Sequence, residues 1–177
     1  MQGRTDRPLS AAGRRQVKSW KLPEVWRDYD WITSPLRRTR DTAKLLIGRV
    51  PIIDSRLIEM SWGRWEGCRL ADLRAEIGEE FDRMAARGSE FQRPGGESPL
   101  QVQARLRPLL TELADQCRPT VGVTHSGVLR AVYAEAVGWD MKDDPPHALH
   151  DDCAQVFSLD AGGKSRVEHL NFSLRVP

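Results

Sequence analysis

The sequence predicts an α/β fold in which a mostly parallel sheet lies between two layers of helices. Segments with helical hydrophobic spacing alternate with short β-branched runs along the whole chain. Polar or glycine-containing junctions follow two of the predicted strands, as is typical of the carboxyl ends of strands in α/β proteins. A length of 177 residues with 40% hydrophobic residues suits one domain. We therefore expect a single three-layer α/β/α domain over residues 1–177.

The first third of the chain predicts a helix, a strand and a second helix. Ser10 is a suitable N-cap for a helix that runs to about Trp20. Residues 31–34 form a short strand candidate that ends at a Ser-Pro pair. Serine can cap free amides and proline lacks the amide that a first helical turn leaves unbonded, so we place a helix over residues 35–47.

The rest of the chain repeats this alternation around one loop. The Gly- and Pro-rich residues 87–98 are expected to form that loop. A helix should begin at Ser98, where Ser98 and Gln101 have capping-box spacing. Its apolar stripe comprises Val102, Leu106, Leu109, Leu110 and Leu113. The other expected elements are extended residues 50–53, a helix over 70–81, a strand over 120–124, a helix after residue 127, and strands over 155–159 and 165–171.

Charge and cysteine content exclude several classes of protein. Charged residues make up 29% of the chain but nearly cancel, with a formal net charge of +2 and no long run of one sign. This argues against a nucleic-acid binder or a membrane-surface binder, which would need a basic stripe. No stretch reaches the length of a transmembrane helix. Cys68, Cys117 and Cys153 lack CxxC spacing, so we expect neither a disulfide framework nor a zinc site, and a reducing cytoplasm suits them.

Two strand-to-helix junctions carry the candidate chemistry. His125 and Ser126 lie at the end of one strand, where a small residue, a glycine and free helix amides leave room for an anion. Position alone leaves open whether His125 binds an anion or is a structural residue. At the other junction, the spacing of Arg37 and Asp41 predicts a surface ion pair, although Asp41 could also pair with Arg38.

Five sequence blocks, in order along nearly the whole chain, resemble those of the histidine phosphatase superfamily (phosphoglycerate-mutase-like, branch 1). The blocks are QGRTDRPLSAAGR from Gln2, SPLRRTRDTA from Ser34, LIEMSWGRWEG from Leu57, PGGES from Pro94 and VTHSG from Val123. The family pattern usually has alanine where this chain has Thr39. The resemblance implies a phosphoglycerate-mutase-like three-layer sandwich.

The same resemblance implies a role for each matching residue. Arg38 should bind the transferred phosphoryl group, His125 should be the second histidine of the phosphate pocket, and Glu59 should donate a proton to the leaving alcohol. Fixed cationic and N–H groups can stabilise phosphoryl charge without a metal or cofactor, and none is implied. Gln2 and Gly3 should border the substrate, while Ser126 and Gly127 should turn backbone amides towards the phosphate.

Other residues in these blocks have structural interpretations. For Glu59 the alternative is a surface ion pair with Arg56 or Arg64. We expect Trp62 and Trp65 to pack in the core and Glu66 to form a structural ion pair. His147, His150 and His169 match no motif and are expected on the surface or in loops.

The family nucleophile is a histidine in an Arg-His-Gly motif on the first, interior strand of the sheet. This sequence has no Arg-His-Gly, and the QG block begins at residue 2. We therefore expect the first interior strand to be absent, Met1 to be an internal methionine of a longer parent protein, and the chain as given to be inactive. Exposed strand edges favour association, so a homodimer is also expected.

The sequence thus predicts a phosphomonoester phosphatase that acts through a phosphohistidine in the complete parent protein. Its partner should be a small phosphorylated metabolite, and its location the cytoplasm. Two alternatives remain: a non-catalytic protein that binds a phosphorylated ligand or a partner protein, and a phosphoglycerate mutase. The short separation of Glu59 and His125 favours hydrolysis over mutase activity.

Overall fold

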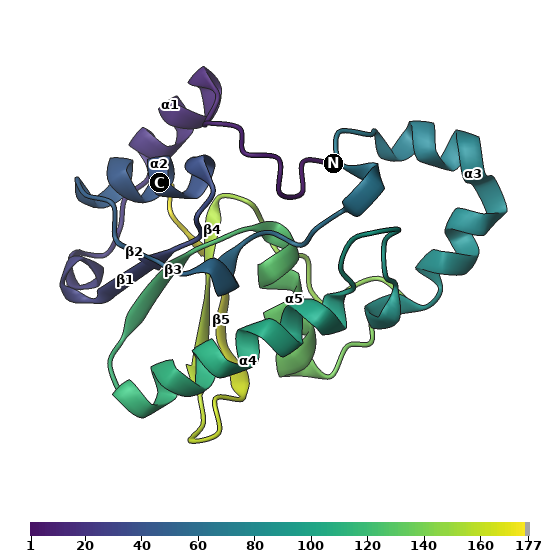
Figure 1. Ribbon diagram of the computed structural model, residues 1–177. Coiled ribbons are helices and arrows are strands. Elements are labelled where there is room, and N and C mark those ends of the chain that lie inside the picture. The colour runs from purple at the N-terminus through teal and green to yellow at the C-terminus, as the bar shows by residue number, and fades with distance from the viewer. Residues whose placement is uncertain (176–177) are drawn as a thin grey trace.

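A computed structural model of the protein describes residues 1–175. Figure 1 shows the order of the elements along the chain. The helices are α1 (Ala11–Ser19), α2 (Arg37–Ile47), α3 (Leu70–Ala85), α4 (Pro99–Gln116) and α5 (Ser126–Val137). The strands are β1 (Asp30–Thr33), β2 (Ile52–Ile53), β3 (Thr120–Val123), β4 (Cys153–Leu159) and β5 (Ser165–Ser173). Short 3₁₀ turns occupy Glu24–Asp28, Ser55–Leu57, Gly63–Trp65 and Gly88–Glu90.

The sheet that positions the candidate site is parallel, in the order β2-β1-β3. Ile32 of β1 pairs with Ile52 of β2 on one side and with Gly122 of β3 on the other. Helices α1 and α2 lie on one side of this sheet, and α4 and α5 lie on the other (Figure 1). This arrangement confirms the predicted α/β fold with helices on both faces.

Strands β4 and β5 form a separate antiparallel hairpin that lies next to β3 (Figure 1). Within residues 1–175, β3 pairs with a strand only on its β1 side, and β4 only on its β5 side. A cavity of about 930 Å³ lies between them, and residues of both strands line it, including Val121, Val123, Ala154 and Val156. Two open strand edges thus face the same largely apolar cavity.

Local sequence explains where helices α1 and α4 begin. The side chain of Ser10 accepts a hydrogen bond from the amide of Gly13, and Ser98 and Gln101 form the predicted capping box. Helix α2 differs, because it begins at Arg37 rather than residue 35. Its first amide donates to the carboxylate of Asp6 at 2.6 Å, so the cap comes from a distant segment that helix-start signals do not identify.

Two clusters of buried side chains form the core. The main cluster joins α4 and α5 to the segment after β2, and comprises Leu57, Met60, Val102, Leu106, Leu109, Val128 and Ala131. The second cluster lies beneath α3 and comprises Trp65, Leu73, Phe81 and Phe91. Helix α3 continues to Ala85, beyond the predicted residue 81, across a kink at Gly78. The two clusters hold the segment of residues 57–65 between them.

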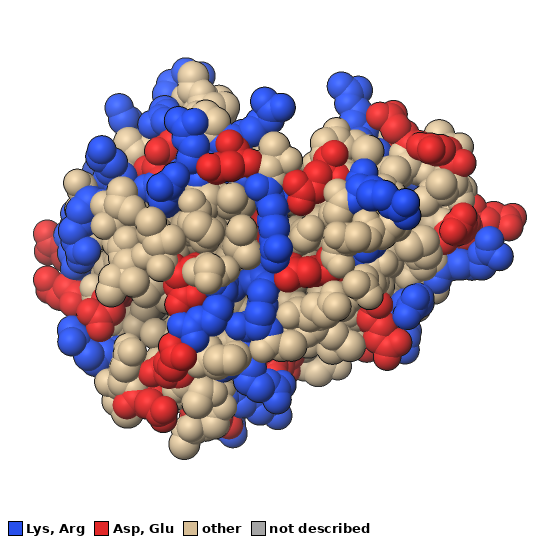
Figure 2. Space-filling view, in the orientation of Figure 1, with Lys and Arg blue, Asp and Glu red and all other residues tan. Residues whose placement is uncertain are grey.

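Basic and acidic side chains intermix on the viewed surface, with Lys and Arg gathered over α1 and α2 (Figure 2). Arg14 of α1 pairs with Asp41 of α2 at 2.7 Å. The expected pairing of Asp41 with Arg37 or Arg38 is therefore wrong, because the neighbouring helix provides a nearer cation. None of the helices described between residues 1 and 175 is both long and apolar enough to cross a membrane.

Position 63 requires a glycine for two reasons, its backbone conformation and its close contact with the backbone of Pro94. Gly63 has φ +54°, and a Cβ atom there would lie 2.2 Å from the carbonyl oxygen of Pro94. We predict that Gly63→Ala lowers the free energy of unfolding by about 3 kcal/mol, measured by urea denaturation.

Gly48→Ala is the matched control for this prediction. Gly48 also has a positive φ, +77°, but a Cβ atom there would meet no atom within 4 Å. Backbone strain alone should then cost about 1 kcal/mol. Equal losses at the two positions would show that the contact with Pro94 has no energetic importance.

Candidate active site

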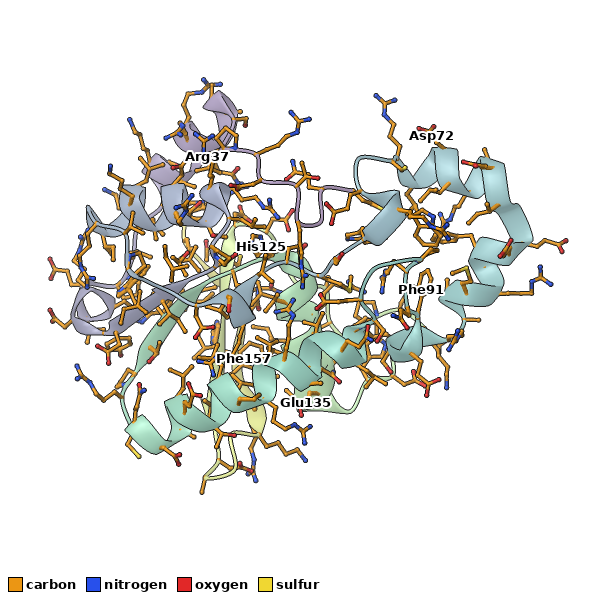
Figure 3. All side chains as sticks on the ribbon, viewed as in Figure 1. Arg37, Asp72, Phe91, His125, Glu135 and Phe157 are labelled. Atoms are coloured by element: carbon orange, nitrogen blue, oxygen red, sulfur yellow. The ribbon has the colours of Figure 1, made fainter. Side chains whose placement is uncertain are left out.

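His125 lies directly after β3 and caps the start of α5, near the centre of the molecule (Figure 3). It is 6% exposed. Its Nδ1 accepts a hydrogen bond from Arg38 Nε at 3.2 Å, so the proton of the neutral ring is on Nε2, 2.7 Å from Ser34 Oγ. Burial and the nearby positive charges of Arg38 and Arg105 lower the pKa of His125 to about 3. The ring is therefore neutral at physiological pH, with a fixed tautomer.

Arg38 lies in the first turn of α2 and is held by backbone carbonyls of the N-terminal segment. Its Nη1 donates to the carbonyl of Thr5 at 3.0 Å, and its Nη2 donates to that of Gly3 at 2.8 Å. With the bond to His125, these contacts use three of the five N–H groups of a guanidinium. Within the described residues 1–175, two N–H groups of Arg38 have no partner and could donate to an anion. Burial lowers the pKa of Arg38, and the negative charge of Glu59 opposes that shift.

Glu59 follows the 3₁₀ turn at Ser55–Leu57 and is 9% exposed. Its carboxylate accepts hydrogen bonds from the amides of Met60 at 2.8 Å and Gly127 at 3.4 Å. Burial raises the pKa of Glu59 despite these bonds. The alternative of a surface ion pair with Arg56 is wrong, because Glu59 is buried and Arg56 pairs with Asp54 and Glu112.

One cavity of about 660 Å³ brings the sequence-predicted site residues together. Arg38, Glu59 and His125 reach it from three different segments of the fold. Its lining residues are Met1, Gln2, Gly3, Leu9, Arg38, Glu59, Trp62, His125, Ser126 and Asp151. Trp62, expected only to pack, therefore also borders this cavity. The arrangement places two free N–H groups of an arginine and a buried carboxyl around one space that an anion could occupy.

The backbone of Glu59 is held by two arginines that the sequence does not single out. Arg4 Nε donates to the carbonyl of Glu59 at 3.1 Å, and Arg105 on α4 donates to the carbonyls of Arg56 and Ile58. Both arginines pair with the carboxylate of Glu97, at 2.8 and 3.1 Å. The matching PGGES block marks Glu97 in the sequence, but no spacing rule connects it with Arg4 or Arg105.

Two other contacts in this region also differ from expectation. Ser34 is fully buried and bonds to His125, whereas the sequence suggests only a helix cap. Glu66, expected in an ion pair, instead accepts hydrogen bonds from the amide of Arg4 at 2.8 Å and the hydroxyl of Thr5 at 3.0 Å. These bonds fix the N-terminal segment whose carbonyls hold Arg38.

The other histidines lie outside this cavity. His147 and His150 are exposed in the segment between α5 and β4, and His169 is exposed on β5. His147 Nδ1 lies 3.0 Å from the hydroxyl of the buried Tyr133. Their surface and loop positions are as predicted.

Comparison with known protein families identifies one family over most of the chain. Residues 1–172 match the family model of the histidine phosphatase superfamily (branch 1).

Relatives of known name are similar over about three quarters of the chain. Glucosyl-3-phosphoglycerate phosphatase of Mycobacterium tuberculosis is 37% identical over 149 residues, which span 76% of this chain and 66% of the relative. The 6-phosphofructo-2-kinase/fructose-2,6-bisphosphatase of Arabidopsis thaliana is 31% identical over 137 residues, 77% of this chain but 18% of that enzyme. The chain thus spans less than two thirds of the length of these relatives.

A solved structure extends the similarity to the whole fold. Mycobacterial glucosyl-3-phosphoglycerate phosphatase with inorganic phosphate superposes with a TM-score of 0.83 at 28% identity. The match covers 100% of this chain and 93% of that chain.

Because the carboxyl of Glu59 is buried, we predict that replacing Glu59 raises the free energy of unfolding, and that this gain depends on pH. Because the folded-state pKa is raised, ionisation costs folding free energy above the ordinary glutamate pKa of 4.5. Glu59→Gln should therefore raise the free energy of unfolding at pH 7 by about 1 kcal/mol. The gain should vanish below pH 4.5, where Glu59 is protonated in both states. Urea denaturation at pH 7 and pH 4 measures it.

Glu97→Gln provides the opposite control. It removes a charge that pairs with two arginines, so it should lower stability at pH 7. A loss of stability on Glu59→Gln at pH 7 would contradict the assignment of Glu59 as a buried, energetically costly acid.

Proposed function

The chain belongs to the histidine phosphatase superfamily (branch 1), and from this premise we propose that it is the greater part of a phosphomonoester phosphatase that acts on a small phosphorylated metabolite. The observation that carries the proposal is the convergence of Arg38, His125 and Glu59 on one cavity. Phosphatases among the relatives support hydrolysis, since one is a glucosyl-3-phosphoglycerate phosphatase and another includes a fructose-2,6-bisphosphatase.

Arg38 and His125 bind the phosphoryl group in this proposal. Because both ring nitrogens of His125 are bonded in this structure, His125 does so by exchanging the bond of its Nε2–H to Ser34 for one to a phosphoryl oxygen. Two N–H groups of Arg38 remain unbonded within residues 1–175 and can donate to phosphoryl oxygens. The amides at the start of α5, beginning with Ser126, add neutral donors at a helix N-terminus. Gln2 and Gly3 border the substrate from the N-terminal segment. These fixed donors stabilise the charge that spreads over the phosphoryl oxygens during transfer.

Glu59 is the proton donor to the leaving alcohol. Its raised pKa favours the protonated carboxyl that a general acid requires. As the ester P–O bond breaks, the alcohol oxygen takes the proton of Glu59 and the phosphorus bonds to the nucleophilic nitrogen. Water then attacks the phosphorus of the phosphohistidine, the ionised Glu59 takes a proton from that water, the P–N bond breaks, and inorganic phosphate leaves.

The nucleophile in this mechanism is a histidine outside the present sequence. His125 is the histidine of this chain that lines the cavity, and both of its ring nitrogens already bond to Arg38 and Ser34. The cavity between β3 and β4 supports a strand as the carrier, because open strand edges flank it on both sides. Arg38 and His125 line both the cavity between β3 and β4 and the cavity of the candidate site. A strand in the first cavity would therefore end close to the proposed phosphate position. A cytoplasmic location and a homodimer remain part of the proposal.

Turnover of p-nitrophenyl phosphate tests this function. Residues 1–177 alone should show none above background, and the chain extended by the in-frame upstream codons that encode Arg-His-Gly should show turnover. In the extended chain, Arg38→Met should lower kcat/KM on the order of 100- to 1,000-fold, since it removes a phosphoryl-binding cation. Arg37→Met, at the exposed neighbouring position, is the control and should change it little.

Four results would count against the proposal. An in-frame stop codon directly upstream would exclude the expected segment. Turnover by residues 1–177 themselves would contradict the external nucleophile. Phosphate binding without turnover in both forms would favour the non-catalytic binder, and transfer of phosphate to a second alcohol in place of water would favour a mutase.

A further inference from the structure

Three charged side chains form a network beside the segment that carries Glu59. Helix α4, which carries Arg105, runs beneath this segment (Figure 1), and Glu97 lies two residues before the helix begins. The carboxylate of Glu97 accepts hydrogen bonds from Arg4 Nη2 at 2.8 Å and from Arg105 Nε at 3.1 Å. The side chains of Glu97 and Arg105 are each 18% exposed, so water screens their charges only in part. One carboxylate thus joins the N-terminal segment to α4.

The two arginines of this network bond to the backbone around Glu59. Arg105 donates to the carbonyls of Arg56 and Ile58. Arg4 Nε donates to the carbonyl of Glu59 itself at 3.1 Å. These bonds fix the stretch of backbone from which the Glu59 side chain reaches the cavity.

Glu97 also bonds directly to this segment, just after Glu59. Its Oε2 accepts a hydrogen bond from the amide of Ser61 at 3.1 Å, and its own amide donates to the carbonyl of Ser61 at 2.9 Å. Replacement of Glu97 would therefore weaken the hold on Ser61 and leave Arg4 and Arg105 without their shared partner. The whole network depends on this one carboxylate.

A second contact between an arginine and a carboxylate in this segment shows a different pattern. Arg56 pairs with Asp54 and with Glu112 of α4, both at 2.7 Å. Within residues 1–175 its guanidinium bonds only to these side chains, and that of Glu112 is 55% exposed. This pair links the segment to α4 without holding the backbone of Glu59. Glu112 is therefore a matched control for Glu97.

The network also affects the balance of charge at the Glu59 carboxyl. Burial raises the pKa of Glu59, and the positive charges of Arg38 and Arg105 oppose that shift. Glu97 pairs with Arg105 and so reduces the positive charge that favours the ionised form of Glu59. The charged and titratable groups that face Glu59 are Arg38 from α2, Arg105 from α4, Arg4 from the N-terminal segment, Arg93 from the loop before α4 and the neutral ring of His125.

We propose that Glu97 is a positioning residue for Glu59: through Arg4 and Arg105 it holds the carboxyl in place and balances the charge of the arginines, so that Glu59 is protonated when substrate binds. This inference rests on the proposed function, in which Glu59 donates a proton to the leaving alcohol. Glu97 does not line the cavity within residues 1–175, so it acts through Glu59 and not on the substrate. The chain thus uses one carboxyl as the acid and a second, paired carboxylate to prepare it.

Titration of the Glu59 carboxyl by carbon-13 NMR in residues 1–177 tests the effect on protonation. Glu97→Gln removes the balancing charge and should lower the pKa of Glu59 by about one pH unit. Glu112→Gln removes a carboxylate that pairs with Arg56 and should leave the pKa of Glu59 unchanged. A pKa of Glu59 that stays the same or rises in Glu97→Gln would overturn the proposal.

The choice of leaving group tests the effect on catalysis in the chain extended by the upstream Arg-His-Gly segment. Phenyl phosphate and p-nitrophenyl phosphate share the same ring, but phenolate is the more basic leaving group and depends more on a proton donor. Glu97→Gln should lower kcat/KM for phenyl phosphate about tenfold more than for p-nitrophenyl phosphate, and Glu112→Gln should lower neither. Equal losses on the two substrates would show a structural role only and would overturn the proposal.

These outcomes differ from those that test the proposed function. Absence of turnover in the extended wild-type chain would overturn the proposed function, whereas turnover there with equal losses in Glu97→Gln would overturn only the role of Glu97. Arg105→Gln covers the case in which Glu97→Gln does not fold. It removes a positive charge near Glu59 but keeps a hydrogen-bond donor, so it should raise the pKa of Glu59. An unchanged or lower pKa in Arg105→Gln would contradict the charge balance that the proposal requires.

Discussion

The hydrogen bond from Arg38 to His125 joins the start of α2 to the end of β3, and the rest of the candidate site depends on it. It fixes the tautomer of His125, and the positive charge of Arg38 helps to keep that ring neutral. Arg38 can hold this position because the carbonyls of Gly3 and Thr5 bind its other nitrogens. The N-terminal segment is therefore part of the site, since its backbone carbonyls orient the guanidinium of Arg38.

The site is built from charges whose burial costs folding energy. Burial raises the pKa of Glu59 and lowers the pKa of Arg38. Glu97, by contrast, is paired with Arg4 and Arg105. Unfavourable burial concentrated around one cavity is typical of functional sites, where a ligand supplies the missing partners.

Local signals predict much of the fold, and sequence blocks predict the members of the site. Ser10 and Ser98 cap helices because the capping contacts lie within three residues. The predicted start of α2 is two residues early, because its cap, Asp6, is distant in sequence. Distance along the chain likewise hides the contacts of Ser34 with His125 and of Arg4 with Glu97.

The central claim is that Arg38 and His125 form one phosphate-binding unit with a neutral histidine. Nitrogen-15 NMR of the imidazole and guanidinium groups at pH 7 tests it most directly. The account predicts that His125 is neutral with its proton on Nε2, and that inorganic phosphate moves the resonances of His125 and Arg38 Nε together. The signals of His147, His150 and His169 should not move. A protonated His125 without ligand, or phosphate-dependent shifts confined to the other histidines, would contradict the account.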